Sequence, residues 1–252
     1  MNTGILKAEG LCKSYGSKRV LEGLDLSVHA GQKVVLTGFN GVGKSTLLNT
    51  LAGRLPPLAG RFRFSEQAAL GYFPQALAWT DGTRTPEELV TGAFPTLDRQ
   101  EARRALARCG VRQEHAIQAV ATLSGGEQAR VKLCLLTLRP CNFLLLDEPT
   151  KGMDSYFKEK LAQILKKLKA QGITVVMVSH DVEFCAQYGD LVSMFFDGQI
   201  LTTATPRRFF GRNSFYTTAA NRMSRCVFRD AITAGDVVEL YRVNGGGDRN
   251  EA

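Results

Sequence analysis

Apolar residues recur along the chain in two patterns, which predict strands and helices in alternation. Short apolar runs at residues 33–37, 143–146 and 173–178 have the length and composition of buried strands. The longer stretch 154–170 carries apolar residues at helical spacing, with lysines on the opposite side, and Gly172 predicts its end. Its apolar stripe consists of Phe157, Leu161, Ile164, Leu165 and Leu168. This alternation predicts an α/β fold with a mainly parallel sheet that is covered on both faces.

The N-terminal part has a different pattern. Residues 5–15 and 20–28 alternate or run apolar around Gly16-Ser17, which predicts an antiparallel β portion. After residue 205 the chain is expected to be helical and basic around 209–225, and the polar residues 244–252 are expected to be disordered. Further predicted elements are strands at 61–64 and 69–73 and helices at 45–51, 86–90, 98–109 and 128–138.

Composition places the chain among ordinary globular proteins. Its 252 residues are enough to bury a large core, with 44% hydrophobic and 22% charged residues. The apolar runs fall far below the roughly 18 residues that cross a bilayer. The N-terminus has no basic segment followed by an apolar core, so we expect a cytoplasmic protein without a secretory signal. The six cysteines have no paired CxxC spacing and are expected to be reduced and structural.

The net charge of +8 fits a protein near anionic lipid or near nucleic acid, and it does not discriminate between them. Five of the lysines lie in the predicted helix 154–170, where they are expected to form its solvated face.

Residues 38–46, Gly-Phe-Asn-Gly-Val-Gly-Lys-Ser-Thr, match the phosphate-loop pattern between a predicted strand and a predicted helix. Glycines let backbone N–H groups surround an anion, and the following helix directs its positive end there. Lys44 is expected to reach the β and γ phosphates of ATP, and the Ser45 hydroxyl to coordinate Mg²⁺. The sequence therefore predicts a P-loop NTPase core whose nucleotide ligands are Gly38, Asn40, Gly41, Gly43, Lys44, Ser45 and Thr46.

Two acidic residues, Asp147 and Glu148, directly follow the predicted strand 143–146. They are expected at the carboxyl end of that strand, near the same phosphates. We expect Asp147 to hold Mg²⁺ through water and Glu148 to orient and polarise the attacking water molecule.

The segment 123–127, Leu-Ser-Gly-Gly-Glu, resembles the signature of the ABC (ATP-binding cassette) family. In that family, the signature serine and glycines lie at a helix N-terminus and cap the γ-phosphate held by the other protomer. The resemblance implies that Ser124, Gly125 and Gly126 of one protomer complete the site of its partner, so that two protomers close over two Mg·ATP. ATP hydrolysis then opens the dimer.

Further positions match the family in order. Tyr15 precedes the phosphate loop and is expected to stack on adenine. Gln75, after Gly-Tyr-Phe-Pro, resembles the Q-loop glutamine that contacts Mg²⁺ and the attacking water. His180 resembles the switch histidine that contacts the γ-phosphate, and Asp154 resembles the D-loop aspartate that crosses the dimer interface.

The two halves of the chain resemble different ABC branches. Residues 1–150, with VLTGFNGVGKSTLL, GYFPQ, ALARCGV and TLSGGEQARVKLC, resemble the F subfamily, which acts on ribosomes. That branch usually has two cassettes with a charged linker, and reads Asn-His-Leu-Asp where this chain has Lys-Gly-Met-Asp at 151–154. From Lys151 onward, SHDVEFCAQYGD, FFDGQI and NSFYTTAANRMSR resemble the ATPase subunits of energy-coupling factor importers.

These resemblances leave three hypotheses. The first is an ATPase subunit of a membrane importer, at the inner face of the cell membrane, paired with an identical or paralogous ATPase and a transmembrane subunit. The second is a soluble F-subfamily-like ATPase on ribosomes, and the third is a fusion of two cassettes at DEPT. The single cassette and the importer-like C-terminal part favour the first, and DNA is not an expected partner. We expect an ATPase domain at 1–212 with a helical subdomain at about 76–140, and a helical extension at 213–243.

Overall fold

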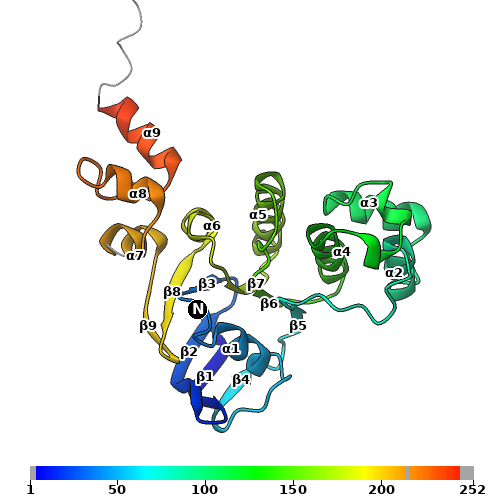
Figure 1. Cartoon of the computed structure of the whole chain (residues 1–252), viewed down its shortest axis with the longest axis horizontal. Coiled ribbons are helices and arrows are strands. Elements are labelled where there is room, and N and C mark those ends of the chain that lie inside the picture. The colour runs from blue at the N-terminus through cyan, green and yellow to red at the C-terminus, as the bar shows by residue number, and fades with distance from the viewer. Residues whose placement is uncertain (1–3, 214–215, 245–252) are drawn as a thin grey trace, which may run out of the picture.

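The computed structural model describes residues 4–213 and 216–244, with a six-stranded sheet at the centre (Figure 1). The strand order is β5-β6-β7-β3-β8-β9, and every neighbouring pair is parallel except β8 and β9. The predicted mainly parallel sheet is therefore confirmed. The bounds are β3 Lys33–Thr37, β5 Leu70–Phe73, β6 Phe143–Asp147, β7 Thr174–Val178, β8 Leu191–Phe196 and β9 Gln199–Ala204.

A second, antiparallel sheet lies beside the first, at the bottom of Figure 1. Its order is β2-β1-β4, with β1 at Gly4–Tyr15, β2 at Lys18–His29 and β4 at Ala59–Phe64. Gly16 and Ser17 connect β1 to β2, and Gly16 has a φ of 59°, which suits glycine. This confirms the predicted antiparallel N-terminal portion.

The helices lie between and beyond these strands (Figure 1). Most expected helices are present within a few residues of their predicted ends. The α-helices are α1 Lys44–Leu51, α2 Pro86–Ala93, α3 Arg99–Arg108, α4 Gly125–Thr137, α5 Ser155–Ala170, α6 Val182–Tyr188, α7 Pro206–Arg212, α8 Ala219–Ser224 and α9 Ala234–Val243. Two 3₁₀ turns, η1 at His115–Ile117 and η2 at Val120–Thr122, precede α4.

Successive side chains of the parallel strands enter two separate cores, because residues alternate between the faces of a sheet. On β3, Val35 packs with the α4, α5 and α6 side, whereas Val34 and Leu36 pack with α1 and the antiparallel sheet. The predicted stripe of α5 enters the first core, with four of its residues buried and Ile164 half-buried. Both faces of the parallel sheet are thus covered, one by helices and the other by α1 and the second sheet.

Two predicted helical stretches are present with different boundaries. The helix expected at 128–138 begins at Gly125, because Ser124 is its N-cap and forms a capping box with Glu127, which places both glycines in the first turn. The helical stretch expected around 209–225 consists of two short helices, since Thr218 caps a new helix and α7 has already ended at Arg212. The sequence had given no indication of α6, β8 or β9, whereas α8 and α9 lie within the helical extension predicted at 213–243.

The helical subdomain, α2 to α4, lies beyond the β5 edge of the sheet, whereas α7 to α9 lie beyond the opposite edge (Figure 1). The helical subdomain has a hydrophobic core of its own, which includes Val90, Leu106 and Val131. The division at residues 212 and 213 remains a prediction, and most of the tail predicted at 244–252 lies outside the described residues.

Within the described ranges, no helix is both long and apolar enough to span a bilayer. All six cysteines are free thiols; Cys109, Cys134 and Cys185 are buried, whereas Cys226 is exposed and has no packing role in the core. The lysines of α5 lie on its solvent side or at its margins, as expected.

Candidate active site

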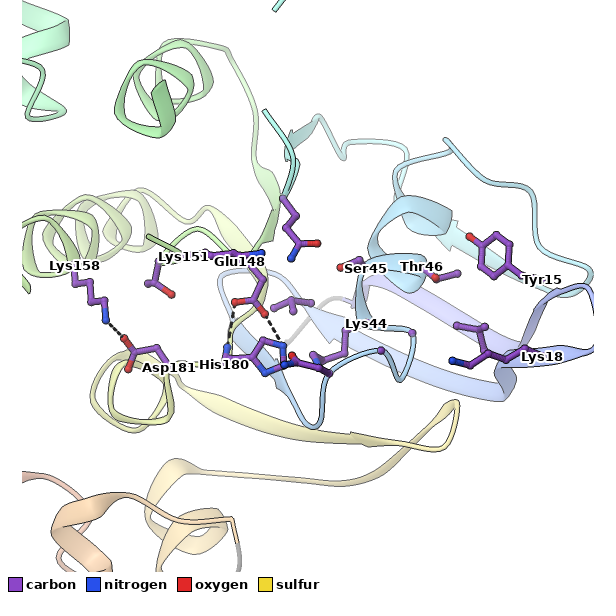
Figure 2. Close-up of a pocket in the computed structure, with 17 residues that line it drawn as sticks. Tyr15, Lys18, Lys44, Ser45, Thr46, Glu148, Lys151, Lys158, His180 and Asp181 are labelled. Carbon is purple, nitrogen blue, oxygen red and sulfur yellow. Dashed lines mark hydrogen bonds and ion pairs between the residues drawn. The ribbon is translucent and has the colours of Figure 1, made fainter. Parts of the chain in front are cut away.

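The carboxyl ends of β3, β6 and β7 meet the phosphate loop at a cavity of about 710 Å³ (Figure 2). Ligands of open α/β sheets bind at such strand ends. Most of the predicted site residues line this cavity: Tyr15, Asn40, Gly41, Gly43, Lys44, Ser45, Thr46, Gln75, Glu148 and His180. The structure therefore brings together predicted site residues from distant parts of the chain; Tyr15 and His180 are 165 positions apart.

The phosphate loop is held between two sheets, and two of its positions require glycine. A Cβ on Gly38 would lie 2.1 Å from the Phe195 backbone oxygen, and one on Gly43 would lie 2.5 Å from the Val20 oxygen. Both residues also have positive φ values, 145° and 111°. Substituting either glycine would therefore displace the loop from β8 or from β2.

Lys44 is buried at the first position of α1 and is held by the loop itself. Its Nζ donates to the carbonyl oxygens of Gly38, at 2.9 Å, and of Phe39, at 2.6 Å. Burial lowers the pKa of this ammonium group, while the carboxylates of Glu148 and Asp147 act in the opposite direction. The cation is thus positioned at the cavity floor, with partners that an anion can replace.

Ser45 and Asp147 bring two oxygen-bearing side chains together beside Lys44. The Ser45 hydroxyl donates to Asp147 Oδ1 at 3.0 Å. Asp147 is almost fully buried, and this burial raises the pKa of its carboxyl group. A buried carboxylate next to a hydroxyl has the hard oxygen donors that Mg²⁺ prefers.

Glu148 has an unusual backbone and an unusual pKa. Its φ is 52°, and its N–H donates to the Val178 oxygen at 3.0 Å, which directs the side chain into the cavity. Its Oε2 accepts from the His180 N–H at 3.3 Å, and its Oε1 lies 3.1 Å from His180 Nε2 (Figure 2). Burial raises the pKa of Glu148 to about 7 and lowers that of His180. Near neutral pH, this pair can hold or release a proton.

The signature segment 123–127 does not reach the phosphate cavity of its own chain. Ser124, Gly125 and Gly126 line a second cavity of about 680 Å³, together with Asp154. A Cβ on Gly126 would lie 3.4 Å from the Gly152 oxygen, so the signature and the 150–154 loop are in close proximity. Gln75, Glu148 and Lys151 line both cavities, and they form the boundary between them.

Asp154 acts within the chain as the N-cap of α5. Its Oδ1 accepts from the Phe157 N–H at 2.7 Å, and its Oδ2 lies 3.2 Å from an Arg130 nitrogen. The Arg130 guanidinium lies over the Phe157 ring, 4.6 Å from its centroid. These contacts join α4 of the helical subdomain to the start of α5.

Several cavity residues had not been identified from the sequence. Lys18, Thr150, Lys151 and Lys158 line the phosphate cavity, and Lys158 pairs with Asp181 at 2.6 Å (Figure 2). The three lysines add positive charge to a site expected to bind an anion. Thr150 ends the segment Asp-Glu-Pro-Thr at 147–150, and Lys151 is the first position at which the chain departs from the F-subfamily pattern, so both had a signal in the sequence. Lys18 and Lys158 belong to no motif.

Comparison with known proteins agrees with this geometry. The ABC transporter family matches residues 21–151. A putative ABC transporter ATP-binding protein of Bacillus thuringiensis is 34% identical, over 93% of this chain and 46% of that protein. The zinc import ATP-binding protein ZnuC of Ruegeria pomeroyi is 37% identical, over 82% of this chain and 80% of that protein. The chain spans about half the length of the first of these relatives.

Among solved structures, a dimeric ATP-binding cassette, MJ0796, bound to ADP and Pi in a post-hydrolysis state, has a TM-score of 0.70 and 25% identity. The match covers 81% of this chain and 99% of that chain. The same α/β cassette architecture is therefore present in both.

Proposed function

Because this chain belongs to the ABC transporter family, we propose that it is an ATP-hydrolysing subunit that energises transport across a membrane. The observation that carries the proposal is the phosphate cavity, where Lys44, Ser45 and Glu148 converge from α1 and the end of β6. An anion-binding loop next to a carboxylate that titrates near neutrality is the arrangement that ATP hydrolysis requires.

Nucleotide binding is assigned to the loop and to Lys44. Backbone N–H groups of the loop and the N-terminus of α1 would face the phosphates. The Lys44 ammonium would exchange the Gly38 and Phe39 carbonyl oxygens for phosphate oxygens, which are stronger acceptors because they are charged. Tyr15, half-exposed at the cavity rim, is placed to cover the base.

Magnesium would be held by Ser45 and Asp147, with Gln75 at the edge of the same cavity. No cluster of three or more His, Cys, Asp or Glu side chains that could hold a metal occurs in the described part of the chain. Mg²⁺ typically uses one or two carboxylates together with substrate phosphates, so the pair suffices. When bound, the cation would neutralise charge on the phosphate oxygens.

Glu148 is the proposed base for hydrolysis. Its carboxylate would accept a proton from the attacking water, and the raised pKa makes it a stronger base than a free glutamate. Two contacts hold His180 against Glu148. His180 follows the carboxyl end of β7, which lies next to the end of β6, and it would donate a hydrogen bond to the γ-phosphate.

A second protomer completes the proposed site. Ser124, Gly125 and Gly126 face a cavity separate from the phosphate loop of their own chain, so a partner must bring them to the phosphates. Asp154 lies in that second cavity and would contact the partner. The dimeric cassette that resembles this chain supports this arrangement.

The membrane partner is inferred from relatives such as the zinc import protein, whose name describes import. A tagged Glu148→Gln protein loaded with Mg·ATP, recovered from solubilised cells, should carry a polytopic membrane subunit. Recovery of ribosomal proteins instead would favour the F-subfamily alternative. The ATPase assignment is tested separately by phosphate release from the purified wild type, with Glu159→Gln, an exposed substitution on α5, as the matched control.

If the wild-type protein releases no phosphate from Mg·ATP, the ATPase assignment is wrong. If Glu148→Gln turns over at the wild-type rate, Glu148 is not the base.

A further inference from the structure

A chain of buried hydrogen bonds runs along the wall of the phosphate cavity, through Thr37, Ser179 and Thr150. Thr37, the last residue of β3, is fully buried, and its Oγ1 donates to the Ser179 backbone oxygen at 3.2 Å. The Ser179 hydroxyl lies 3.1 Å from the Thr150 hydroxyl. Thr37 directly precedes the phosphate loop, Ser179 precedes His180, and Thr150 follows Glu148 by two positions. These contacts therefore join the three strand ends that carry the site.

The chain of hydrogen bonds continues into the C-terminal part of the protein. The Tyr216 hydroxyl lies 2.5 Å from Thr37 Oγ1, although 179 positions separate the two residues. Because the Thr37 proton is directed to Ser179, Tyr216 is the donor of this bond. Burial raises the pKa of the Tyr216 hydroxyl, which keeps it protonated as a donor.

The Tyr216 ring also contacts the phosphate loop. It packs edge-on against Phe39, with 6.4 Å between ring centroids, and against Phe209 of α7 at the same distance. Phe39 is the second residue of the loop, and its carbonyl oxygen is one of the Lys44 acceptors. Aromatic pairs of this geometry add to the stability gained by burial. The loop is thus supported by one residue through both a ring and a hydroxyl.

Tyr216 is held in place by the C-terminal unit, which is defined here as residues 206–244. The Thr217 hydroxyl donates to the Phe210 oxygen at 2.7 Å, and the Tyr216 N–H donates to Asn213 Oδ1 at 2.8 Å. The Ala219 N–H donates to Glu183 Oε1 at 2.7 Å, which ties α8 to α6. Since α6 begins two residues after His180, the unit contacts both the loop and the segment that carries His180.

We propose that Tyr216 is a positioning residue for the ATPase reaction: its hydroxyl on Thr37 and its ring on Phe39 let the C-terminal unit set the geometry of the phosphate loop and of the strand ends that carry His180 and Glu148. This proposal rests on the proposed function. Tyr216 is not among the residues that line the phosphate cavity, and it acts through Thr37, Ser179 and Phe39. The C-terminal unit thereby becomes part of the active-site support.

The test is a double-mutant cycle on the full chain, with Tyr216→Phe, Thr37→Val and the double variant. Loss of one buried hydrogen bond should lower kcat/KM for ATP, and raise the Kd for ATP, by about fivefold. Tyr216→Phe removes the bond between the two hydroxyls, whereas Thr37→Val removes that bond and also the one to the Ser179 oxygen. The double variant should therefore lose little more than Thr37→Val alone. Thr37→Ser keeps the hydroxyl and should stay within about twofold of the wild type.

The matched control is Thr203→Val, which removes a 2.7 Å hydroxyl pair with Ser193 between β8 and β9 and changes no residue of the phosphate loop. If Tyr216 has a structural role only, Tyr216→Phe should lower the urea unfolding midpoint as Thr203→Val does, and kcat/KM and the Kd for ATP should equal those of the wild type. That result, or fully additive losses in the double variant, would overturn the proposal. Absence of wild-type ATPase activity would instead count against the proposed function, and the Kd for ATP measured by calorimetry would still decide the role of Tyr216.

Discussion

Glu148 should make the nucleotide-free protein less stable as the pH rises, and Glu148→Gln should remove that loss. In the fold, the side chain is 5% exposed, and its pKa is raised from 4.5 to about 7, chiefly by burial. The folded state therefore binds more protons than the unfolded state between these two values. Stability contributed by the neutral carboxyl is present below the unfolded pKa and is lost as the pH rises through the folded pKa.

The size of the effect follows from the shift. A difference of about 2.5 pKa units, at 1.36 kcal/mol each, corresponds to roughly 3 kcal/mol. Glutamine has nearly the same shape as the protonated side chain and cannot ionise, so it keeps the contacts to His180 at every pH. We expect Glu148→Gln to be about 3 kcal/mol more stable than the wild type at pH 8, and similar to it near pH 4.5.

The assay is urea unfolding without nucleotide or magnesium, at half-unit steps from pH 4.5 to 8.5. Glu159→Gln, an exposed change on α5, controls for the altered net charge. Parallel pH curves for the wild type and Glu148→Gln would refute the argument, because they would mean that burial does not hold a proton on this carboxyl group.

Three further outcomes are expected. Lys44→Ala should weaken ATP binding by roughly 10- to 100-fold in calorimetry, because a charged donor to phosphate is lost, and unchanged affinity would contradict the loop assignment. The wild-type kcat/KM should fall about tenfold per pH unit below the Glu148 pKa of about 7, since the base must be ionised, and a flat profile from pH 6 to 8 would exclude that role. Phe157→Ala should cost about 3–5 kcal/mol in urea unfolding, as it empties a fully buried site under Arg130, and a loss below about 1 kcal/mol would disprove its core role.

Local patterns predicted much of this fold. The apolar runs at 33–37 and 143–146 became central strands, because a strand buried on both faces shows a nearly continuous apolar run instead of alternation. The β8–β9 hairpin was missed although Asp197-Gly198 is a strong turn signal; both residues have positive φ, 46° and 73°. The seven residues of α6 are too few to show a helical period.

The candidate site also contains some residues that the sequence could identify and others that it could not. Lys44, Ser45 and Glu148 belong to contiguous motifs, so the sequence could identify them, and the cavity brings them together. The contact between Thr37 and Tyr216 joins positions in different elements with no shared motif. Such pairs depend on how distant elements pack, which a single sequence does not display.

The two glycines that let the phosphate loop pass between β2 and β8 limit how this protein can be recombined. Gly43 passes Val20 of the antiparallel sheet, and Gly38 passes Phe195 of the parallel sheet, both with no space for a methyl group. The spacing between the two sheets therefore determines the conformation of the phosphate loop. An N-terminal sheet taken from another cassette would have to reproduce that spacing to within a few tenths of an ångström. The affinity of each chimaeric protein for ATP would show whether its phosphate loop keeps the binding conformation.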